Sequence, residues 1–458
     1  MRSSVTIWMF PARDLATVKA LHPSLKSVLF RDRTRDLVSH TQSALPTELP
    51  FLDKTMKRKN HKEGVLLLPD WSKMPTEMLE QVCKLLTIPN QVRFITVCKS
   101  WLSANTSKKA YHWIPDAPWL VSNDCTSTEF QVISTTDKQA YNISKPFSPL
   151  QNTIIVGSSK GWLILRSDQS LFILNLFSKL RLDLPPIRTM SCLLCSKGDD
   201  CFGMHTPVAF TISMCPNMNP TLVAIVTYKG DLGWCKVGDT TWKCYHTSDK
   251  VYSNVAFHDN KLYAVERGGL KVNMFKYDEG VLVQVGSVES TDPIEHAPNL
   301  SRTIRSYCMT IYLVECGGNV LVVKRFSDDT KFHTPTIDFV IFEVDENCTT
   351  PQLVKVENLD DHVLFVSNIN IECLDAKFCP TFQRDSVYFT GFSENSFITE
   401  VGVFSISDRT IHKIPLNNPQ MHSPSSIWMM PRFSFECDCE VCTSTPWFRP
   451  RQLRKRHM

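Results

Sequence analysis

The chain has 458 residues, a formal net charge of +4, 21% charged residues and 43% hydrophobic residues. This composition is typical of a folded globular protein, and the length favours two or three domains. So balanced a charge argues against a nucleic-acid-binding protein, which usually presents a strongly basic face. No apolar stretch reaches the roughly 18–20 residues that cross a bilayer. We therefore expect neither a nucleic-acid partner nor a membrane-integral segment.

Residues 1–70 begin irregularly and end in a polar, basic linker, KTMKRKNHKEG at 54–64. Arg and Ser are frequent, as in mitochondrial transit peptides, but Asp14, Asp32 and Asp36 interrupt the positive charge, and such peptides are poor in acidic residues. The linker also has the composition of a nuclear signal, although a solvated linker is the more common meaning. We expect 1–70 to be a largely disordered extension.

The spacing of apolar residues predicts helices over 72–107. Leu79, Val82, Cys83 and Leu86 recur at the intervals that form one helical face. Pro75 suits the first turn of this helix, because a missing N–H costs little there. Pro89 and Asn90 are expected to end the first helix and start the second, and Val97, Trp101 and Leu102 form an apolar stripe on a third segment.

From about residue 117 the pattern changes to short runs of β-branched and aromatic residues separated by Gly, Pro, Asn and Asp. The strands are predicted at 161–167, 170–176, 222–228, 261–266, 319–326, 336–344, 386–392 and 401–406. Many short strands with frequent turns indicate an all-β sandwich, barrel or propeller. Six aromatic residues in this region are interpreted as packing residues: Trp162, Trp234, Trp242, Tyr263, Tyr388 and Trp428.

Cysteine is abundant, with 17 residues, and the chain starts without an apolar secretory leader. We expect reduced thiols, mostly buried as small hydrophobic side chains. Two cysteine groups invite a zinc interpretation, but their spacing does not give the two well-separated pairs that a structural zinc site needs, so we expect no metal. These groups are Cys437, Cys439 and Cys442 with the distant His457, and Cys192 and Cys195 with Cys201.

Catalytic motifs are not found. The sequence has no phosphate-binding loop of the G-x4-GK[ST] form, no G-x-S-x-G elbow and no H-E-x-x-H helix. His362, after Asp360 and Asp361, is interpreted as a solvated loop residue rather than a base. We expect no cofactor and no enzymatic activity, and a propeller enzyme finds no supporting constellation of residues.

The stretch WSKMPTEMLEQVCKLLTIPNQVRFITVCKSWLSA, 71–104, resembles an F-box, with Met74-Pro75 at its start and a Val-x-Lys-x-Trp ending. It departs from the family pattern at Met74, where Leu is usual, and at 90–95, where an acidic-Leu-Leu segment is usual. The resemblance implies binding to an SKP-type adaptor and, through it, to a cullin–RING ubiquitin ligase. The adaptor-binding residues it implies are Met74, Pro75, Met78, Leu79, Val82, Leu86, Val97, Lys99 and Trp101.

A series of marks over about 155–433 resembles the C-terminal domain of a plant family of F-box proteins, the KIB-like type, for which a propeller fold is implied. The marks are KGWLILRSDQSLFILNLFSKLRLDLPPI at 160–187, YKGDLGW at 228–234, VAFHDNKLYAVERGG at 255–269, YLVECGGNVLVVKRF at 312–326, SVYFTGF at 386–392 and SIWMMPRF at 426–433. Asn175-Leu176 stands where Asn-Pro is usual in the family.

These observations predict an α+β multidomain chain: a small N-terminal helical F-box at 71–107, a mainly antiparallel β-propeller domain at 117–435, and a Cys-containing basic tail at 436–458. The implied function is the substrate-recognition subunit of an SCF-type ligase, located in the nucleus or cytoplasm, with an unknown protein as its target. The alternative is a propeller scaffold with a degenerate F-box, for which the extension would allow an organellar location.

Overall fold

The computed structural model describes two stretches of the chain, 71–106 and 117–432. The first stretch has gaps at 85, 87 and 96, and the second has gaps at 125–126, 136–138, 147–152, 168–169, 191–206, 216–219, 246–249, 270, 291–306, 330–334, 347–350, 378, 393–397 and 415–425. The extension at 1–70, the tail at 436–458 and both cysteine groups considered for zinc lie outside the described residues. Those predictions therefore stay predictions.

The helical module contains one 3-10 turn and three short helices: η2 (Trp71–Lys73), α3 (Thr76–Lys84), α4 (Ile88–Ile95) and α5 (Lys99–Thr106). The first helix starts directly after Pro75, whose carbonyl accepts the amide of Leu79 at 3.1 Å. Pro89 does not end the first helix, because α3 already ends at Lys84, but the predicted start of the second helix is confirmed, because α4 begins at Ile88. Pro89 lies in the first turn of α4. Backbone amides there have no acceptor within the helix, so the absence of an N–H on proline costs no hydrogen bond. None of the helices described is long and apolar enough to span a membrane.

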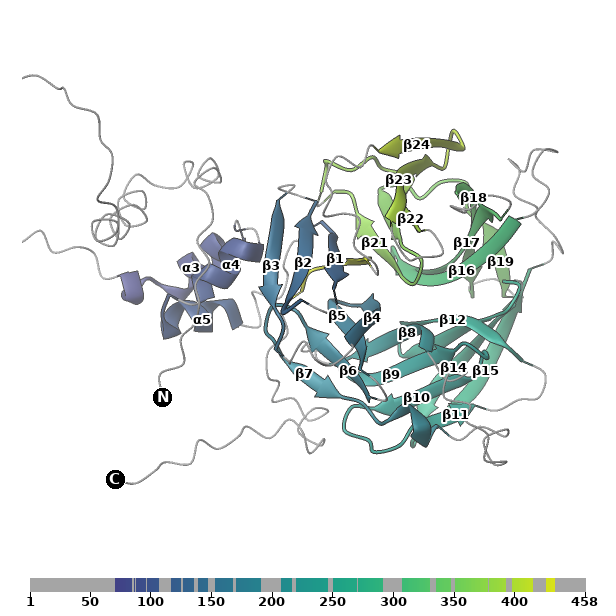
Figure 1. Cartoon of the computed structure of the whole chain (residues 1–458), viewed down its shortest axis with the longest axis horizontal. Coiled ribbons are helices and arrows are strands. Elements are labelled where there is room, and N and C mark those ends of the chain that lie inside the picture. Colours follow the sequence, from purple (N-terminus) through teal and green to yellow (C-terminus); the bar gives the residue numbers. More distant parts are fainter. Residues whose placement is uncertain are drawn as a thin grey trace, which may run out of the picture. The chain divides into compact units, whose positions relative to one another are not determined.

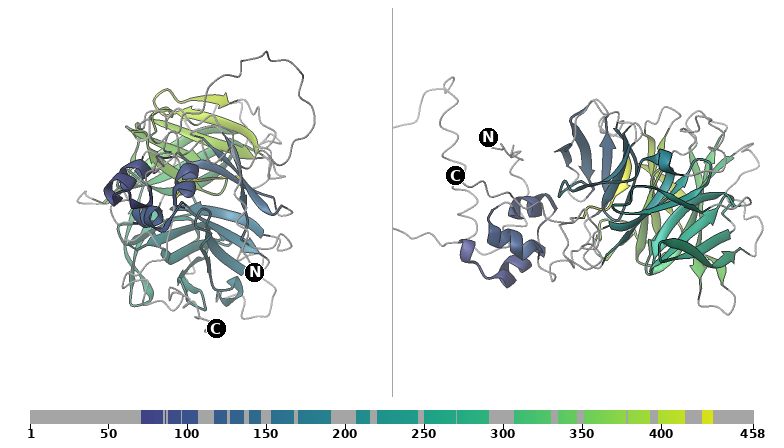
Figure 2. Two further views of the ribbon diagram at one scale, coloured as in Figure 1. Left: turned by 90° about the vertical axis from the view of Figure 1, so that its left-hand side faces the viewer. Right: turned by 90° about the horizontal axis from the view of Figure 1, so that it is seen from below.

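The β domain consists of twisted antiparallel sheets arranged around a centre (Figure 1), which we call blades and number along the chain. Blade 1 contains β1 (Trp119–Asn123), β2 (Glu129–Ser134), β3 (Ala140–Ser144) and β25 (Ile427–Met429); blade 2 contains β4 (Thr153–Ser159), β5 (Trp162–Ser167), β6 (Ser170–Asn175) and β7 (Arg181–Asp183); blade 3 contains β8 (Pro207–Met214), β9 (Pro220–Thr227), β10 (Leu232–Lys236) and β11 (Lys243–Tyr245). Figure 2 shows the same blades from two further sides.

Blades 4 and 5 are joined into one sheet by a single parallel pair, Glu289 with Gln352. Blade 4 contains β12 (Tyr252–His258), β13 (Lys261–Glu266), β14 (Lys271–Asp278) and β15 (Val281–Glu289); blade 5 contains β16 (Tyr307–Cys316), β17 (Asn319–Asp328), β18 (Thr336–Asp345) and β19 (Gln352–Lys355); blade 6 contains β20 (His362–Val366), β21 (Ile371–Asp375), β22 (Ser386–Phe392), β23 (Ile398–Ser405) and β24 (Thr410–Ile414). Blade 6 departs from the simple up-and-down order, because β22 runs parallel to β20 and β21 takes the innermost place.

Apolar clusters between neighbouring blades close the ring. Along β1, Trp119 and Val121 pack with blade 2, whereas Leu120 packs with Phe365 of blade 6. Successive side chains of a strand point to opposite faces, so each inner strand contributes to the clusters on both sides. Within the described β domain, six such clusters lie between the six successive pairs of blades. The β domain is therefore a closed six-bladed propeller.

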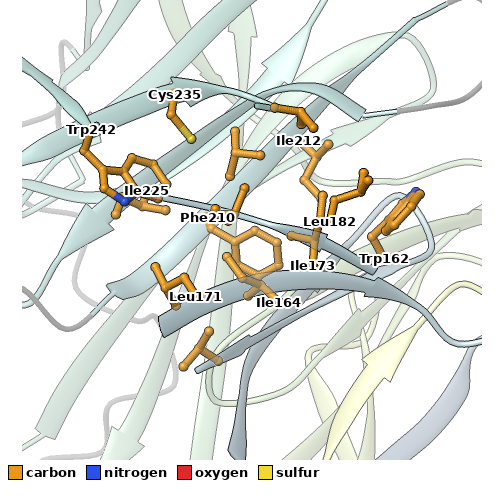
Figure 3. Packing of buried hydrophobic residues seen from close by; sticks show 14 of the residues in the cluster. Trp162, Ile164, Leu171, Ile173, Leu182, Phe210, Ile212, Ile225, Cys235 and Trp242 are labelled. Carbon is orange, nitrogen blue, oxygen red and sulfur yellow. The ribbon is translucent and has the colours of Figure 1, made fainter. Parts of the chain in front are cut away.

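The cluster between blades 2 and 3 illustrates the fit (Figure 3). The ring of Phe210 on β8 lies among side chains of β5 and β6, including Ile164 and Ile173. Gly157 on β4 makes room for this ring, because a Cβ at that position would lie 2.2 Å from its Cε1 atom. A side chain at 157 would therefore force the two blades apart.

The ring is closed by pairing the two ends of the β domain. The last strand, β25, pairs antiparallel with the first, β1, and Trp428 lies opposite Leu120. Because β25 is the innermost strand of blade 1, this blade is assembled from segments at opposite ends of the domain. Closing a ring of sheets in this way leaves no free inner edge between the first and last blade.

The predicted strands are confirmed: β13 and β22 span the predicted residues, and the other six predicted runs overlap β5, β6, β9, β17, β18 and β23. The packing interpretation of the aromatic residues is also confirmed for five of the six, with Trp162, Trp234, Trp242, Tyr263 and Trp428 each at most 4% exposed. Tyr388 is half-buried and stacks on Phe365, with 5.3 Å between ring centroids.

The cysteines depart in one respect from the expectation of reduced thiols. Cys316 at the end of β16 and Cys373 in β21 form a disulfide between blades 5 and 6. The two residues are 57 positions apart, and the packing of β16 beside β21 brings their Cα atoms to 5.5 Å. Of the cysteines that remain free thiols, Cys83, Cys215, Cys235 and Cys379 are buried, as predicted.

Candidate functional site: the helical module

The helical module has a small apolar core of its own. Leu79 and Cys83 of α3, Phe94 of α4 and Ala104 of α5 are buried together. Burial raises the pKa of the Cys83 thiol to about 11, so this cysteine is a neutral, apolar side chain. The core explains the helical spacing in the sequence, because the apolar face of α3 is the face that packs on α4 and α5.

Hydrogen bonds from two side chains, Gln91 and Trp101, connect the elements of the module. Gln91 is buried, and its Nε2 donates to the carbonyls of Cys83 at 3.1 Å and Leu86 at 2.8 Å, where α3 ends. The indole N–H of Trp101 donates to the carbonyl of Trp71 at 3.0 Å, which ties α5 to the first turn of the module. The ring of Trp101 also lies 4.5 Å from that of Phe94, measured between centroids.

The residues implied for adaptor binding occupy three different environments. Pro75, Met78, Val97 and Lys99 are exposed, with Met78 58% and Val97 57% exposed. Met74, Val82, Leu86 and Trp101 are half-buried against the core. Leu79 has no exposed surface and therefore supports the module from inside. The assignment of these residues to adaptor contact stays a prediction.

Leu102 is an exposed apolar residue that the F-box pattern does not single out. It lies on α5 next to Trp101 and is 40% exposed. The sequence carried a signal for it, because Leu102 belongs to the same apolar stripe as Val97 and Trp101. Among the described residues of this module, the large apolar side chains that are exposed are Met78, Val97 and Leu102.

The propeller contains a second candidate site, a partly open central cavity of about 460 Å³ lined by residues of all six blades. The sequence analysis assigned no binding role to its charged lining residues Lys160, Glu315, Glu372, Asp375 and Arg432. His362 was interpreted there as a solvated loop residue, but it starts β20, is half-buried and lines this cavity. Glu372 had a detectable signal, because it is a lone carboxyl within the otherwise uncharged run 369–374.

A three-helix module of this kind followed by a propeller defines an F-box protein with a C-terminal β-propeller. Comparison with known proteins agrees: residues 71–113 match the F-box domain, and residues 131–409 match the family described as KIB1-4 beta-propeller. The latter match covers more than half of the chain. The chain belongs to the KIB1-4 beta-propeller family.

The chain is similar along most of its length to proteins of Arabidopsis thaliana. It is 22% identical to "Probable F-box protein At4g22060", over 79% of this chain and 96% of that protein. It is 23% identical to "F-box/kelch-repeat protein At1g57790", over 79% of this chain and 94% of that protein. Among solved structures, the N-terminal domain of Nup159 is similar at 11% identity and a TM-score of 0.31, over 66% of this chain and 77% of that chain.

Proposed function

We propose that this chain is the substrate-recognition subunit of an SCF-type cullin–RING ubiquitin ligase. The observation that carries the proposal is the exposure of Met78 and Val97 on a module that matches the F-box domain and buries Leu79, Cys83 and Phe94 in its own core. Exposed apolar side chains on a small helical module are typical of a protein–protein contact. An SKP-type adaptor is the partner that the F-box match supports.

The energetics are consistent with a contact of this size. Burying one aliphatic side chain of this kind contributes roughly 1.5–3 kcal/mol. Met78, Val97 and Leu102 together would contribute several kcal/mol, from which the cost of association is subtracted. The half-buried Met74, Val82 and Leu86 would add further apolar contact area.

The chain itself would contribute no catalysis. The helical module would hold the ligase and the propeller would hold the target protein, so that ubiquitin transfer by other subunits becomes effectively intramolecular. Loops on one face of a propeller are the usual place for target binding, because they vary without disturbing the blades.

A co-purification experiment tests the proposal. The full chain with both Met78→Ser and Val97→Ser should retain less than about one tenth of the SKP-type adaptor that the wild type retains, because each substitution removes apolar contact area. A matched control is the chain with Val281→Ser and Val283→Ser, two valines of β15 that are 55% and 48% exposed. The control should bind the adaptor as the wild type does.

The competing function is a scaffold whose degenerate F-box binds no adaptor. It would be favoured if the wild-type chain fails to retain the adaptor, or if the Met78 and Val97 variant binds it unchanged. We also propose a nuclear or cytoplasmic location, and imaging of a fluorescent fusion of the full chain tests it. An organellar signal would support the scaffold instead.

A further inference from the structure

The central cavity of the propeller has the size of a small-molecule site. Its volume of about 460 Å³ lies within the roughly 300–1,000 Å³ that ligand pockets usually have. All six blades contribute to its lining, through β4, β8, β12, β16 and β21 and through the residues that follow β25. A ligand in this cavity would therefore contact residues that are far apart in the sequence.

The carboxylate of Glu315 in this cavity already has its partners. The Nζ atom of Lys160, in the turn after β4, lies 3.2 Å from Glu315 Oε2, and His258 Nδ1 lies 3.3 Å from Glu315 Oε1. Partial burial acts to raise the pKa of Glu315, but Lys160 and His258 outweigh it and hold this pKa below its ordinary value. Glu315 therefore stays ionised. Because each of its two oxygens already has a partner, it has little hydrogen-bonding capacity left for a cationic ligand.

Glu372, the second carboxyl in the lining, is only 9% exposed. Burial raises its pKa to about 7, although Arg432, a hydrogen bond from Ser158 Oγ at 3.0 Å, and Lys160 act in the opposite direction. Near neutral pH a large fraction of the molecules holds this carboxyl uncharged. In that state Glu372 does not neutralise Arg432.

Arg432 is a charged group of the lining whose guanidinium keeps its hydrogen-bonding capacity, whereas Lys160 is already ion-paired with Glu315. Among the residues that the structure describes, none forms a hydrogen bond or ion pair with its guanidinium. Its position is nevertheless fixed: Asn175 Nδ2 donates to its backbone carbonyl at 2.8 Å, and its side chain packs over Gly161. A Cβ at position 161 would lie 2.5 Å from the Cβ of Arg432, so only glycine permits this approach.

We propose that the central cavity binds a small organic anion whose carboxylate or phosphate group is held by Arg432 and Lys160. A guanidinium presents parallel N–H donors that match the oxygens of such a group, and Lys160 supplies a second positive charge on the same cavity. The body of the ligand would lie along the half-apolar remainder of the cavity, between side chains such as Met214 and Ile369.

Binding should be tighter at lower pH. The charges that act on Glu372 are those of Arg432 and Lys160, while Ser158 and the backbone of Met430 supply its hydrogen bonds. Glu315, His362 and Asp375 also line the cavity. When Glu372 ionises, its negative charge competes with the ligand for Arg432 and Lys160. When Glu372 is neutral, this competition ends, so anion binding and proton uptake at Glu372 are coupled.

Isothermal titration of the full chain with succinate, and separately with inorganic phosphate, tests the proposal and distinguishes the two ligand chemistries. At least one anion should bind saturably at about pH 6 and constant ionic strength, and about fivefold or more weakly at about pH 8. Arg432→Gln should weaken binding about tenfold or more, and Lys160→Gln about threefold or more.

Two further variants distinguish specific anion binding in the cavity from nonspecific electrostatic attraction to the protein surface. Lys276→Gln changes an exposed lysine of β14 that does not line the cavity, and it should bind the anion as the wild type does. Glu372→Gln should bind succinate, which is mainly a dianion at both pH values, with nearly equal affinity at about pH 6 and about pH 8. The proposal would be overturned if neither anion binds saturably, if Arg432→Gln binds like the wild type, or if Lys276→Gln weakens binding as much as Arg432→Gln.

Discussion

Lys160 and Glu315 form an ion pair across the centre of the propeller, with 3.2 Å between Nζ and Oε2. Lys160 follows β4, which packs beside β8 and β25, whereas Glu315 lies on β16, which packs beside β12 and β21. The order of the inner strands therefore places the two residues on opposite sides of the ring. Among the described residues, the blades of Lys160 and Glu315 share no apolar cluster, so the ion pair is a direct link between opposite blades.

A double-mutant cycle with Lys160→Gln and Glu315→Gln should show a small favourable coupling. The two side chains are 28% and 43% exposed, so water screens their attraction, and we expect a coupling of about 0.5–1 kcal/mol in the free energy of unfolding. Urea unfolding at low ionic strength measures it, and about 1 M salt should reduce it. A coupling of zero at low ionic strength would show that the pair adds nothing to the closed ring.

Glu372 should make the protein less stable as the pH rises through neutrality. Its pKa is raised from an ordinary value of 4.5 to about 7, so between these values the folded state holds a proton that the unfolded state has released. Raising the pH across this window removes up to about 3 kcal/mol of stability, and above it the loss is complete.

The variant Glu372→Gln checks this dependence, because the amide does not titrate. Relative to Glu372→Gln, the wild type should lose stability between about pH 5 and about pH 8, as measured by urea unfolding at several pH values. Glu357→Gln, at an exposed carboxylate, serves as the control and should follow the wild type. If the free energy of unfolding changes with pH in the same way for the wild type and Glu372→Gln, the raised pKa of Glu372 is contradicted.

The strands of the propeller were predictable for a physical reason. Each blade is covered on both faces by a neighbouring blade, so the strands that the sequence predicted, such as β5, β6 and β13, are continuous buried runs rather than alternating patterns. In β13, for example, Leu262 and Ala264 belong to one cluster, whereas Tyr263 and Val265 belong to the next. Such runs, bounded by turn residues, mark a strand clearly even without knowledge of its neighbours.

The order of strands in blade 6 and the lining of the cavity could not be predicted in the same way. The parallel pairing of β20 with β22 depends on which strand of the blade lies innermost. The pattern of apolar residues within a strand does not indicate its position in the blade. Lys160, Glu315, Glu372 and Arg432 meet only because the ring closes. The helical module was easier, since its core depends on contacts between residues less than 30 positions apart.

Trp428 should be essential for closing the ring. It lies on the three-residue strand β25, is 4% exposed, and its ring centroid is 5.4 Å from that of Phe365 in blade 6. Trp428→Ala would leave a cavity between blades 1 and 6, and we expect a loss of about 3–5 kcal/mol in the free energy of unfolding. Trp428→Phe keeps most of the contact and should cost less. A loss below about 1 kcal/mol for the alanine variant would mean that β25 is not needed to hold the first and last blades together.

Leu79 and Met78 are neighbours on α3 whose substitution should have opposite consequences. Leu79 is fully buried in the core of the helical module, so Leu79→Ala should cost about 2–5 kcal/mol of the local stability of that module. Met78 is 58% exposed, and Met78→Ala should cost less than about 0.5 kcal/mol.

Amide hydrogen exchange of the full chain, followed in peptides from α3 and α5, reports the stability of this module separately from that of the propeller. Protection should fall in both helices for Leu79→Ala and stay unchanged for Met78→Ala, which should lose adaptor binding only. Equal loss of protection in the two variants would show that Met78 is a structural residue, and the surface assigned to the adaptor would then have to exclude it.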